Sequence, residues 1–224
     1  MILFVGQKTR PNQTTTEIAL QNQVTHSLCC KIEVKMPAAS SEASVQELIQ
    51  LLDAAVDTDD DCLRCRSVKK VLHEIVESQR DFIAEEFLKP APDRYARRLL
   101  HRDPRGRYTV LVMVWDKGQG TPLHDHAGMW CVECVYRGRI KVVSYSCQTL
   151  EEDLFQFQRE KEVFASIADA GALIPPFDYH TIENANETPA ITIHVYGGEM
   201  TWCHAFEKVD GGYHMRRREL SYTS

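Results

Sequence analysis

Two histidines close together give the first chemical signal in the sequence. His124 and His126 are separated by Asp125 alone. Successive side chains of an extended backbone alternate between its two faces, so both imidazoles project from one face and can bind one metal ion, while Asp125 points away. A His-x-His pair alone is weak support for a metal site, because two histidines on a strand are often surface residues. A metal site here needs further ligands from elsewhere in the chain.

A second polar row follows later in the chain. Thr192, His194 and Tyr196 alternate with Ile191, Ile193 and Val195. On a strand the three polar side chains share one face and the apolar ones share the other. A polar row facing the inside of a barrel is either part of a site or a buried hydrogen-bond network that serves packing, and both interpretations are open at this point.

The elements that must position these residues are predicted from hydrophobic periodicity. Val45, Leu48, Ile49 and Leu52 follow the i, i+3, i+4, i+7 spacing of an amphipathic helix. A longer apolar stripe, in one or two pieces, begins near Val68 and ends before two prolines. The sequence therefore predicts helices over about 44–90.

After residue 95 the period changes to that of strands. β-branched and aromatic residues dominate short segments separated by turn residues, and no gap between them holds the crossover helix that parallel strands need. We therefore predict a mainly β, antiparallel barrel over about 95–218, with the helices packed at one end. The predicted strands are 108–115, 129–136, 139–146, 162–167, 191–196, 200–206 and 213–217.

Composition limits the partners of this chain. Its 224 residues carry 26 Lys and Arg against 32 Asp and Glu, a net charge of −6, so no general field attracts nucleic acid. No apolar run is long enough to span a bilayer, no obligate protein partner is evident, and a cytoplasmic location is predicted. Residues 1–38 are predicted to be an irregular extension, and residues 39–224 a single domain.

Two longer patterns resemble the two motifs of the cupin family. The first reads Gly118-x5-His124-x-His126-x4-Cys131-x6-Gly138. The second keeps Pro175, His180 and Asn184. Cys131 stands where most cupins have a glutamate ligand, and Phe177 where the second motif usually has glycine. The resemblance implies a double-stranded antiparallel jelly roll, in agreement with the strand pattern.

Among cupins, the chain is similar to the cysteine dioxygenase type I family from about residue 44 to its C-terminus. That family has a His-Asp-His followed by a cysteine, a third histidine, a Tyr-x-Arg, a Ser-x-His-x-Tyr and a downstream cysteine. Thr192 replaces the serine and keeps the hydroxyl. The matching residues are His124, Asp125, His126, Cys131, His180, Tyr95, Arg97, Thr192, His194, Tyr196 and Cys203.

The resemblance implies one Fe(II) per chain, with O2 as co-substrate and a small-molecule thiol as substrate. Three neutral imidazoles would leave the ion its full charge, which favours an anionic thiolate. The implied metal ligands are His124, His126 and His180. The implied catalytic residues are Tyr196, His194 and Cys131, and the implied substrate-binding residues are Arg97, Tyr95, Thr192 and Cys203.

Three assignments have alternatives. Arg97 would bind a substrate carboxylate, but it also belongs to a basic run that could form surface ion pairs on a helix or turn. Cys131 and Tyr196 would form a thioether, yet Cys131 has the wrong parity relative to His126, so a bulge or turn near Gly128 is required. Glu133 is an alternative metal ligand, because it could be the carboxylate with which most cupins bind their metal.

The predicted function is an iron-dependent thiol dioxygenase of cysteine catabolism, which oxidises L-cysteine with O2 to cysteine sulfinic acid. The nearest alternative is a dioxygenase for 3-mercaptopropionate or another mercapto-acid. More distant alternatives are a non-catalytic metal-binding cupin and a zinc enzyme of hydrolysis or isomerisation.

Overall fold

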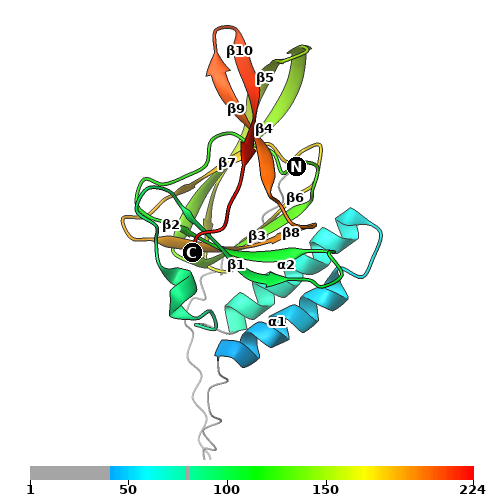
Figure 1. The fold of residues 1–224 in the computed structure, drawn as a ribbon, viewed down its shortest axis with the longest axis vertical. Helices are drawn as coiled ribbons and strands as arrows, with labels where there is room; N and C mark the ends of the chain where they lie inside the picture. The colour runs from blue at the N-terminus through cyan, green and yellow to red at the C-terminus, as the bar shows by residue number, and fades with distance from the viewer. Residues whose placement is uncertain (1–40, 79–80) are drawn as a thin grey trace, which may run out of the picture.

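Two antiparallel sheets of five strands each enclose the core (Figure 1). The computed structural model describes residues 41–78 and 81–224. The first sheet has the strand order β1-β2-β8-β3-β6 and the second the order β7-β4-β5-β10-β9. The strands are β1 Ala96–Arg102, β2 Thr109–Trp115, β3 Cys131–Arg137, β4 Arg139–Glu151, β5 Leu154–Ser166, β6 Ala170–Leu173, β7 His180–Asn184, β8 Ala190–Tyr196, β9 Trp202–Val209 and β10 Gly212–Glu219.

This architecture confirms the predicted fold class, a mainly β jelly roll of the cupin type with helices before it. In the described part of the chain the two sheets stay separate and do not close into one continuous hydrogen-bonded barrel. The predicted division into an extension over 1–38 and one domain over 39–224 stays a prediction, because the extension lies outside the described residues.

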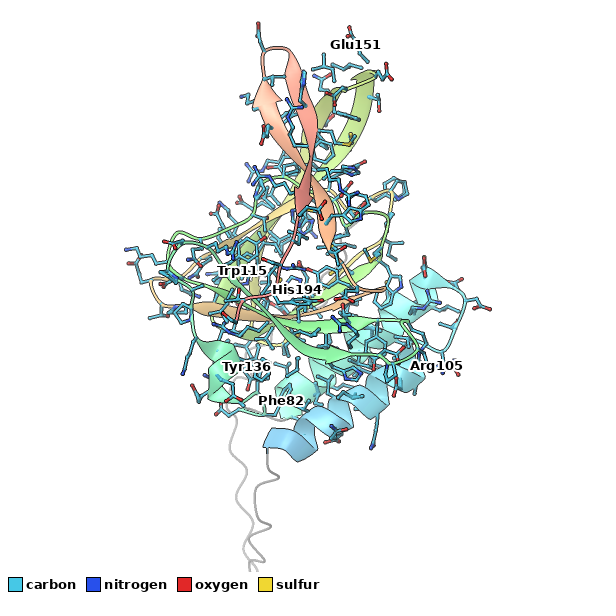
Figure 2. All side chains as sticks on the ribbon, viewed as in Figure 1. Phe82, Arg105, Trp115, Tyr136, Glu151 and His194 are labelled. Atoms are coloured by element: carbon cyan, nitrogen blue, oxygen red, sulfur yellow. The ribbon has the colours of Figure 1, made fainter. Side chains whose placement is uncertain are left out.

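The first sheet is buried on both faces, and each face belongs to a different core. On β2, Val110, Val112 and Val114 pack outward against the helices. Leu111, Met113 and Trp115 point into the space between the sheets. In Figure 2, Trp115 and His194 lie between the sheets, whereas Phe82 and Tyr136 lie on the helix side. The same alternation on β8 sends its polar row inward.

Two helices cover the outer face of the first sheet (Figure 1). Helix α1 spans Ser41–Ala55 and packs on α2, Asp61–Ser78, which in turn packs on β3 and β6. A short 3-10 helix, Glu85–Leu88, follows. The helices agree with the predicted range of about 44–90, except that α1 begins three residues earlier, at Ser41. No helix of the described residues is long and apolar enough to cross a membrane.

Three strands were not predicted from the sequence. β1 carries the basic run, so Arg97, Arg98 and Arg102 lie on a strand rather than on a helix or turn. β6 has four residues and β7 has five, and both are too short and too rich in small or polar residues for a strand pattern to emerge. β7 begins with His180, so a strand that the pattern missed carries one of the predicted ligands.

A polar contact ties α1 to the barrel. Arg107 donates hydrogen bonds to the buried Asp103 carboxylate, from Nε at 2.8 Å, and it also pairs with Asp53 of α1. The Tyr108 hydroxyl donates to the same Asp53 carboxylate at 3.1 Å. The hydrogen bond from Arg107 lowers the pKa of Asp103 from 3.8 to about 2.

We expect Asp103→Asn to lower the free energy of unfolding at pH 7 by about 2 kcal/mol, because a charge-assisted hydrogen bond is lost. The folded-state pKa lies below the unfolded value, so the stabilisation is present above pH 4 and disappears as the pH falls toward 2. Denaturant unfolding at pH 7 and pH 3 measures this. The gap between variant and wild type should shrink at pH 3, and Asp59→Asn, in an exposed loop, is the control.

Candidate active site

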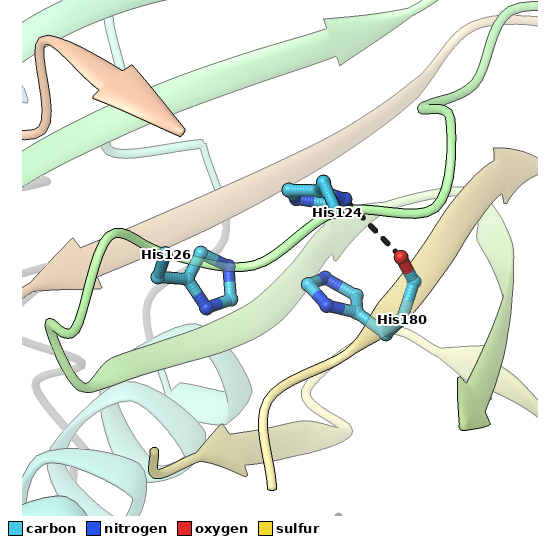
Figure 3. Close-up of side chains that lie close together, drawn as sticks. All are labelled: His124, His126 and His180. Atoms are coloured by element: carbon cyan, nitrogen blue, oxygen red, sulfur yellow. Dashed lines mark hydrogen bonds between the residues drawn. The ribbon is translucent and has the colours of Figure 1, made fainter. Parts of the chain in front are cut away.

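Three histidines gather between the sheets (Figure 3). One nitrogen from each of His124, His126 and His180 lies within 4.8 Å of the others, and all three residues are buried. The separation of their ring centroids is 4.4 Å for His124 and His180 and 4.9 Å for His126 and His180. The structure thus brings together the three residues that the sequence predicted as metal ligands.

A pair of backbone hydrogen bonds joins two of these histidines. The amide of His124 donates to the carbonyl of His180, and the amide of His180 donates to the carbonyl of His124, each at 3.2 Å. On the other side, the His124 segment pairs with Ala205 of β9. Asp125 points away from the cluster, as the alternation predicts, and its carboxylate lies 2.7 Å from His204 Nδ1.

The hydrogen bonds of the ring nitrogens fix the tautomers. His124 Nδ1 lies 3.1 Å from the carbonyl oxygens of Pro122 and His180, and His180 Nδ1 lies 2.8 Å from the carbonyl of Asp178. A carbonyl can only accept, so each Nδ1 carries the proton and each Nε2 keeps a free lone pair. Burial lowers the pKa of His124 to about 4 and that of His180 well below 6.5, so both rings are neutral.

This donor set fits a first-row transition metal. Neutral imidazoles with a free Nε2 are the form in which histidine binds such ions, and the opposite nitrogens are anchored as in many metal sites. His126 is anchored differently. Its Nδ1 lies 3.4 Å from the Asp178 carboxylate, whose Oδ2 also accepts the His126 amide at 3.0 Å. Burial opposes ionisation of Asp178, but the contacts with the His126 ring and amide outweigh it and lower the pKa of Asp178.

A tight turn brings Cys131 to the inside. Ala127 and Gly128 both have positive φ, at 53° and 81°, and the Met129 amide donates to the His126 carbonyl at 3.0 Å. The turn resets the alternation of the strand, as the parity of Cys131 required. In the β3–β8 ladder Cys131 stands directly opposite Tyr196. The two side chains therefore share the inner face of the sheet.

The polar row of β8 forms one chain of contacts. Trp115 Nε1 donates to Thr192 Oγ1 at 2.9 Å, Thr192 Oγ1 lies 2.8 Å from His194 Nε2, and His194 Nδ1 lies 3.3 Å from the Tyr196 hydroxyl. Burial lowers the pKa of His194 well below 6.5 and raises that of Tyr196 well above 10. The imidazole is therefore neutral and the phenol keeps its proton.

Arg97 lies at the other end of this pocket. It is 5% exposed, which contradicts the alternative of a surface ion pair. Its Nη2 donates to the Met200 carbonyl at 3.2 Å and its Nη1 to the Ser221 carbonyl at 3.4 Å. Among the described residues no carboxylate lies within ion-pair distance of its guanidinium, so the charge of Arg97 is not neutralised by the protein.

The segment after β10 packs over this arginine. The amide of Thr223 donates to the Arg97 carbonyl at 2.7 Å, and the Arg97 amide donates to Thr223 Oγ1 at 3.0 Å. The Tyr222 ring lies 5.8 Å from the guanidinium carbon. Backbone and side-chain contacts from 220–224 thus hold Arg97 in place.

A cavity connects the site with the surface. It has a volume of about 450 Å³, and Tyr95, Arg97, His124 and Cys203 are among its lining residues. The same four residues also line a smaller inner pocket against the three histidines, Trp115, His194 and Tyr196. The Tyr95 ring stacks on Trp115 at 4.6 Å. The predicted substrate-binding residues therefore border this space, except Thr192, which lies behind His194.

Two buried acids surround the site without belonging to the ligand cluster. Asp178 was missed by the sequence analysis, although its position two residues before His180 was a signal that could have found it. Glu133, the alternative ligand, is absent from the histidine cluster, and its carboxylate Oε2 lies 3.9 Å from His194 Nδ1 instead. The structure therefore does not place Glu133 with the metal ligands.

Comparison with known proteins identifies the family of this chain. The sequence model of the family "Cysteine dioxygenase type I" matches residues 35–209. The chain belongs to the cysteine dioxygenase type I family. Cysteine dioxygenase type 1 of Homo sapiens is 24% identical over 119 residues, which cover 53% of this chain and 58% of the human protein. The chain thus matches a little over half the length of that relative.

Other members and neighbours are more distant. Cysteine dioxygenase type 1 of Danio rerio is 22% identical over 174 residues, which cover 75% of this chain and 81% of that protein. Among solved structures, a cupin 2 domain-containing protein from Halorhodospira halophila is 18% identical, with a TM-score of 0.40, over 59% of this chain and 81% of that one.

In this cysteine dioxygenase family member, we expect Asp178→Asn to weaken metal binding about 10- to 100-fold, because the partner that orients His126 and raises its basicity loses its charge. Anaerobic titration of the metal-free protein with Fe(II) or Co(II) measures the affinity. Glu183→Gln, on the same strand as His180 and exposed, is the matched control. Equal affinities for both variants would contradict this role for Asp178.

Proposed function

We propose that this chain is an iron-dependent thiol dioxygenase that oxidises L-cysteine with O2 to cysteine sulfinic acid. The observation that carries the proposal is one pocket with two features. A cluster of three buried histidines lies at its inner end, and the uncompensated guanidinium of Arg97 borders the same space. A small thiol with a carboxylate matches both ends. Membership of the family supports the same reaction class.

His124, His126 and His180 would hold the Fe(II). Imidazole binds a metal as a neutral donor, so three histidine ligands would leave the ion its full charge, which would favour binding of a thiol as the thiolate. Bound there, Fe(II) would supply the electron transfer that lets O2 react with a thiolate. The overall reaction adds both atoms of O2 to the sulfur of one thiol, so it needs no further reductant.

Arg97 would bind the substrate carboxylate. A guanidinium presents five donors, and two of its N–H groups are taken by the carbonyls of Met200 and Ser221. The remaining donors can form the paired N–H···O bonds that Arg makes with a carboxylate. Because the Arg97 charge is already buried, an anionic substrate would neutralise it, which favours carboxylate thiols over neutral ones.

Tyr196 would act as a hydrogen-bond donor to the reacting groups. Its phenol stays protonated because burial raises its pKa. Its ring centroid lies 5.7 Å from that of His126. His194 would orient the hydroxyl from behind, and Thr192 would position His194 rather than bind substrate directly. Tyr95 and Cys203 would shape the entrance of the pocket.

Cys131 and Tyr196 would form the thioether that many members of this family have. Their positions opposite each other in the β3–β8 ladder support it. The bond would join Cys131 Sγ to a ring carbon of Tyr196. The thiol hydrogen and one ring hydrogen, with two electrons, would reduce one O2 to H2O2. Peptide mapping by mass spectrometry would find the two residues in one crosslinked fragment, which Cys131→Ala must abolish.

The proposed function predicts O2 uptake by anaerobically Fe(II)-loaded protein when L-cysteine is added, with cysteine sulfinate formed in equal amount. 3-Mercaptopropionate tests the alternative substrate and should be oxidised more slowly. Faster oxidation of 3-mercaptopropionate would keep the reaction and replace the substrate. No uptake with either thiol at full iron occupancy would favour a non-catalytic metal-binding cupin. Turnover of a substrate without O2 by the zinc-loaded protein would favour hydrolysis or isomerisation.

We expect Arg97→Gln to reduce kcat/KM for L-cysteine about 10- to 100-fold, which is the rate equivalent of a lost charge-assisted hydrogen bond. Cysteamine lacks a carboxylate, so its slower oxidation should change little in the variant. Arg94→Gln, exposed at the cavity entrance, controls for the loss of a nearby positive charge. An equal loss for both thiols would mean that Arg97 maintains the pocket and does not bind the carboxylate.

A further inference from the structure

Glu133 is a buried acid without a hydrogen-bond partner. It is 1% exposed, and among the described residues neither carboxyl oxygen has a hydrogen-bond partner. An isolated carboxylate in such surroundings is costly, so the group is held as the neutral acid. Burial accordingly raises the pKa of Glu133 to about 8. Even the neutral acid destabilises the fold compared with an apolar side chain of similar shape.

Strand register directs this acid toward one residue. In the β3–β8 ladder Glu133 stands directly opposite His194, one step along the inner face from the pair of Cys131 and Tyr196. Its Oε2 lies 3.9 Å from His194 Nδ1, and the side chains of Glu133 and His194 are 1% and 2% exposed. This is longer than a hydrogen bond but close enough for the dipoles of the two groups to interact without water between them.

The network on the other side of His194 offers a hydrogen-bond donor to one of its ring nitrogens. Thr192 Oγ1 already accepts a hydrogen bond from Trp115, so its own hydroxyl hydrogen is free to be donated to His194 Nε2. The ring is neutral, so when Thr192 donates to Nε2 the one ring proton resides on Nδ1. In the other tautomer Nε2–H donates to Thr192 instead. Nδ1 faces the Tyr196 hydroxyl at 3.3 Å, with Glu133 Oε2 and Cys131 Sγ each at 3.9 Å.

We propose that Glu133 is a positioning residue that acts through His194 on Tyr196. This inference rests on the proposed function. The acceptor oxygen of Glu133 stabilises the tautomer of His194 with the proton on Nδ1. In that tautomer Nδ1–H donates to the Tyr196 oxygen, so the phenolic hydrogen cannot be given to His194. It turns to the pocket side instead, where Met113 Sδ, which lines the pocket, lies 3.8 Å from the hydroxyl as a weak acceptor that a substrate can replace. Without Glu133 the other tautomer becomes more populated, and Tyr196 can donate to His194 instead of to substrate.

Glu133→Leu tests the role in catalysis. Leu has a similar shape and no acceptor, so kcat should fall about three- to tenfold, the rate equivalent of one neutral hydrogen bond, with little change in KM. Glu133→Gln keeps a carbonyl acceptor and should retain most of the activity. The melting temperature of the Leu variant should rise, because an unpartnered buried acid is removed. Should Leu fail to fold, Glu133→Met replaces it, and Glu152→Leu is an exposed control.

A double-mutant cycle separates action through Tyr196 from general packing. In a Tyr196→Phe background, Glu133→Leu should have no further effect on kcat, because the hydroxyl that Glu133 orients is gone. Equal losses in both backgrounds would overturn the proposal. A Leu variant with higher stability and unchanged kcat would also overturn it, since Glu133 would then have no role in positioning.

A measurement on the metal-free protein makes the test independent of activity. Nitrogen-15 NMR of labelled histidine reports which nitrogen of His194 carries the proton. We expect the proton on Nδ1 in wild type and a larger share on Nε2 in Glu133→Leu. Unchanged tautomers would overturn the proposal. If the loaded wild-type protein oxidised no thiol, the proposed function would fail, while a tautomer shift would still show that Glu133 controls His194.

Discussion

Two backbone hydrogen bonds between His124 and His180 determine where the site can form. They join segments that are 56 residues apart in the chain, one in a loop before β3 and the other at the start of β7. Because these bonds involve the main chain, they fix the separation of the two backbone positions from which the imidazoles project. His126 follows from the same loop. The geometry of the cluster is therefore a property of strand pairing, and side-chain contacts add the correct ring orientation.

The interior around this cluster has an unusual charge balance. It holds four buried histidines, a tyrosine and a glutamate, and burial keeps most of these groups neutral. Two further buried groups, Asp178 and Arg97, are charged. The contacts with His126 stabilise the charge of Asp178, and the guanidinium of Arg97 donates to carbonyl oxygens. The Asp178 charge lies on the far side of His126, whereas the Arg97 charge faces the pocket. The pocket thus has imidazole nitrogens at one end and a positive charge at the other.

Much of this arrangement could be predicted from the sequence. The alternation of Thr192, His194 and Tyr196 predicted one inward row, and the parity of Cys131 required a turn, which the positive φ angles of Ala127 and Gly128 provide. Strand β1 could not be predicted, because charged residues such as Arg98 and Arg102 obscure the alternation around the buried Arg97. The partnerless state of Glu133 was also beyond prediction. Periodicity gives the face on which a side chain lies, but the absence of a partner depends on every neighbouring strand.

The segment 220–224 carries a practical consequence. Its amide and hydroxyl groups at Thr223, and the carbonyl of Ser221, bind the backbone and guanidinium of Arg97 directly. Leu220 also lines the inner pocket. Affinity tags, fluorescent fusions and truncations placed next to this segment would therefore disturb the position of Arg97, the residue proposed to bind the substrate carboxylate.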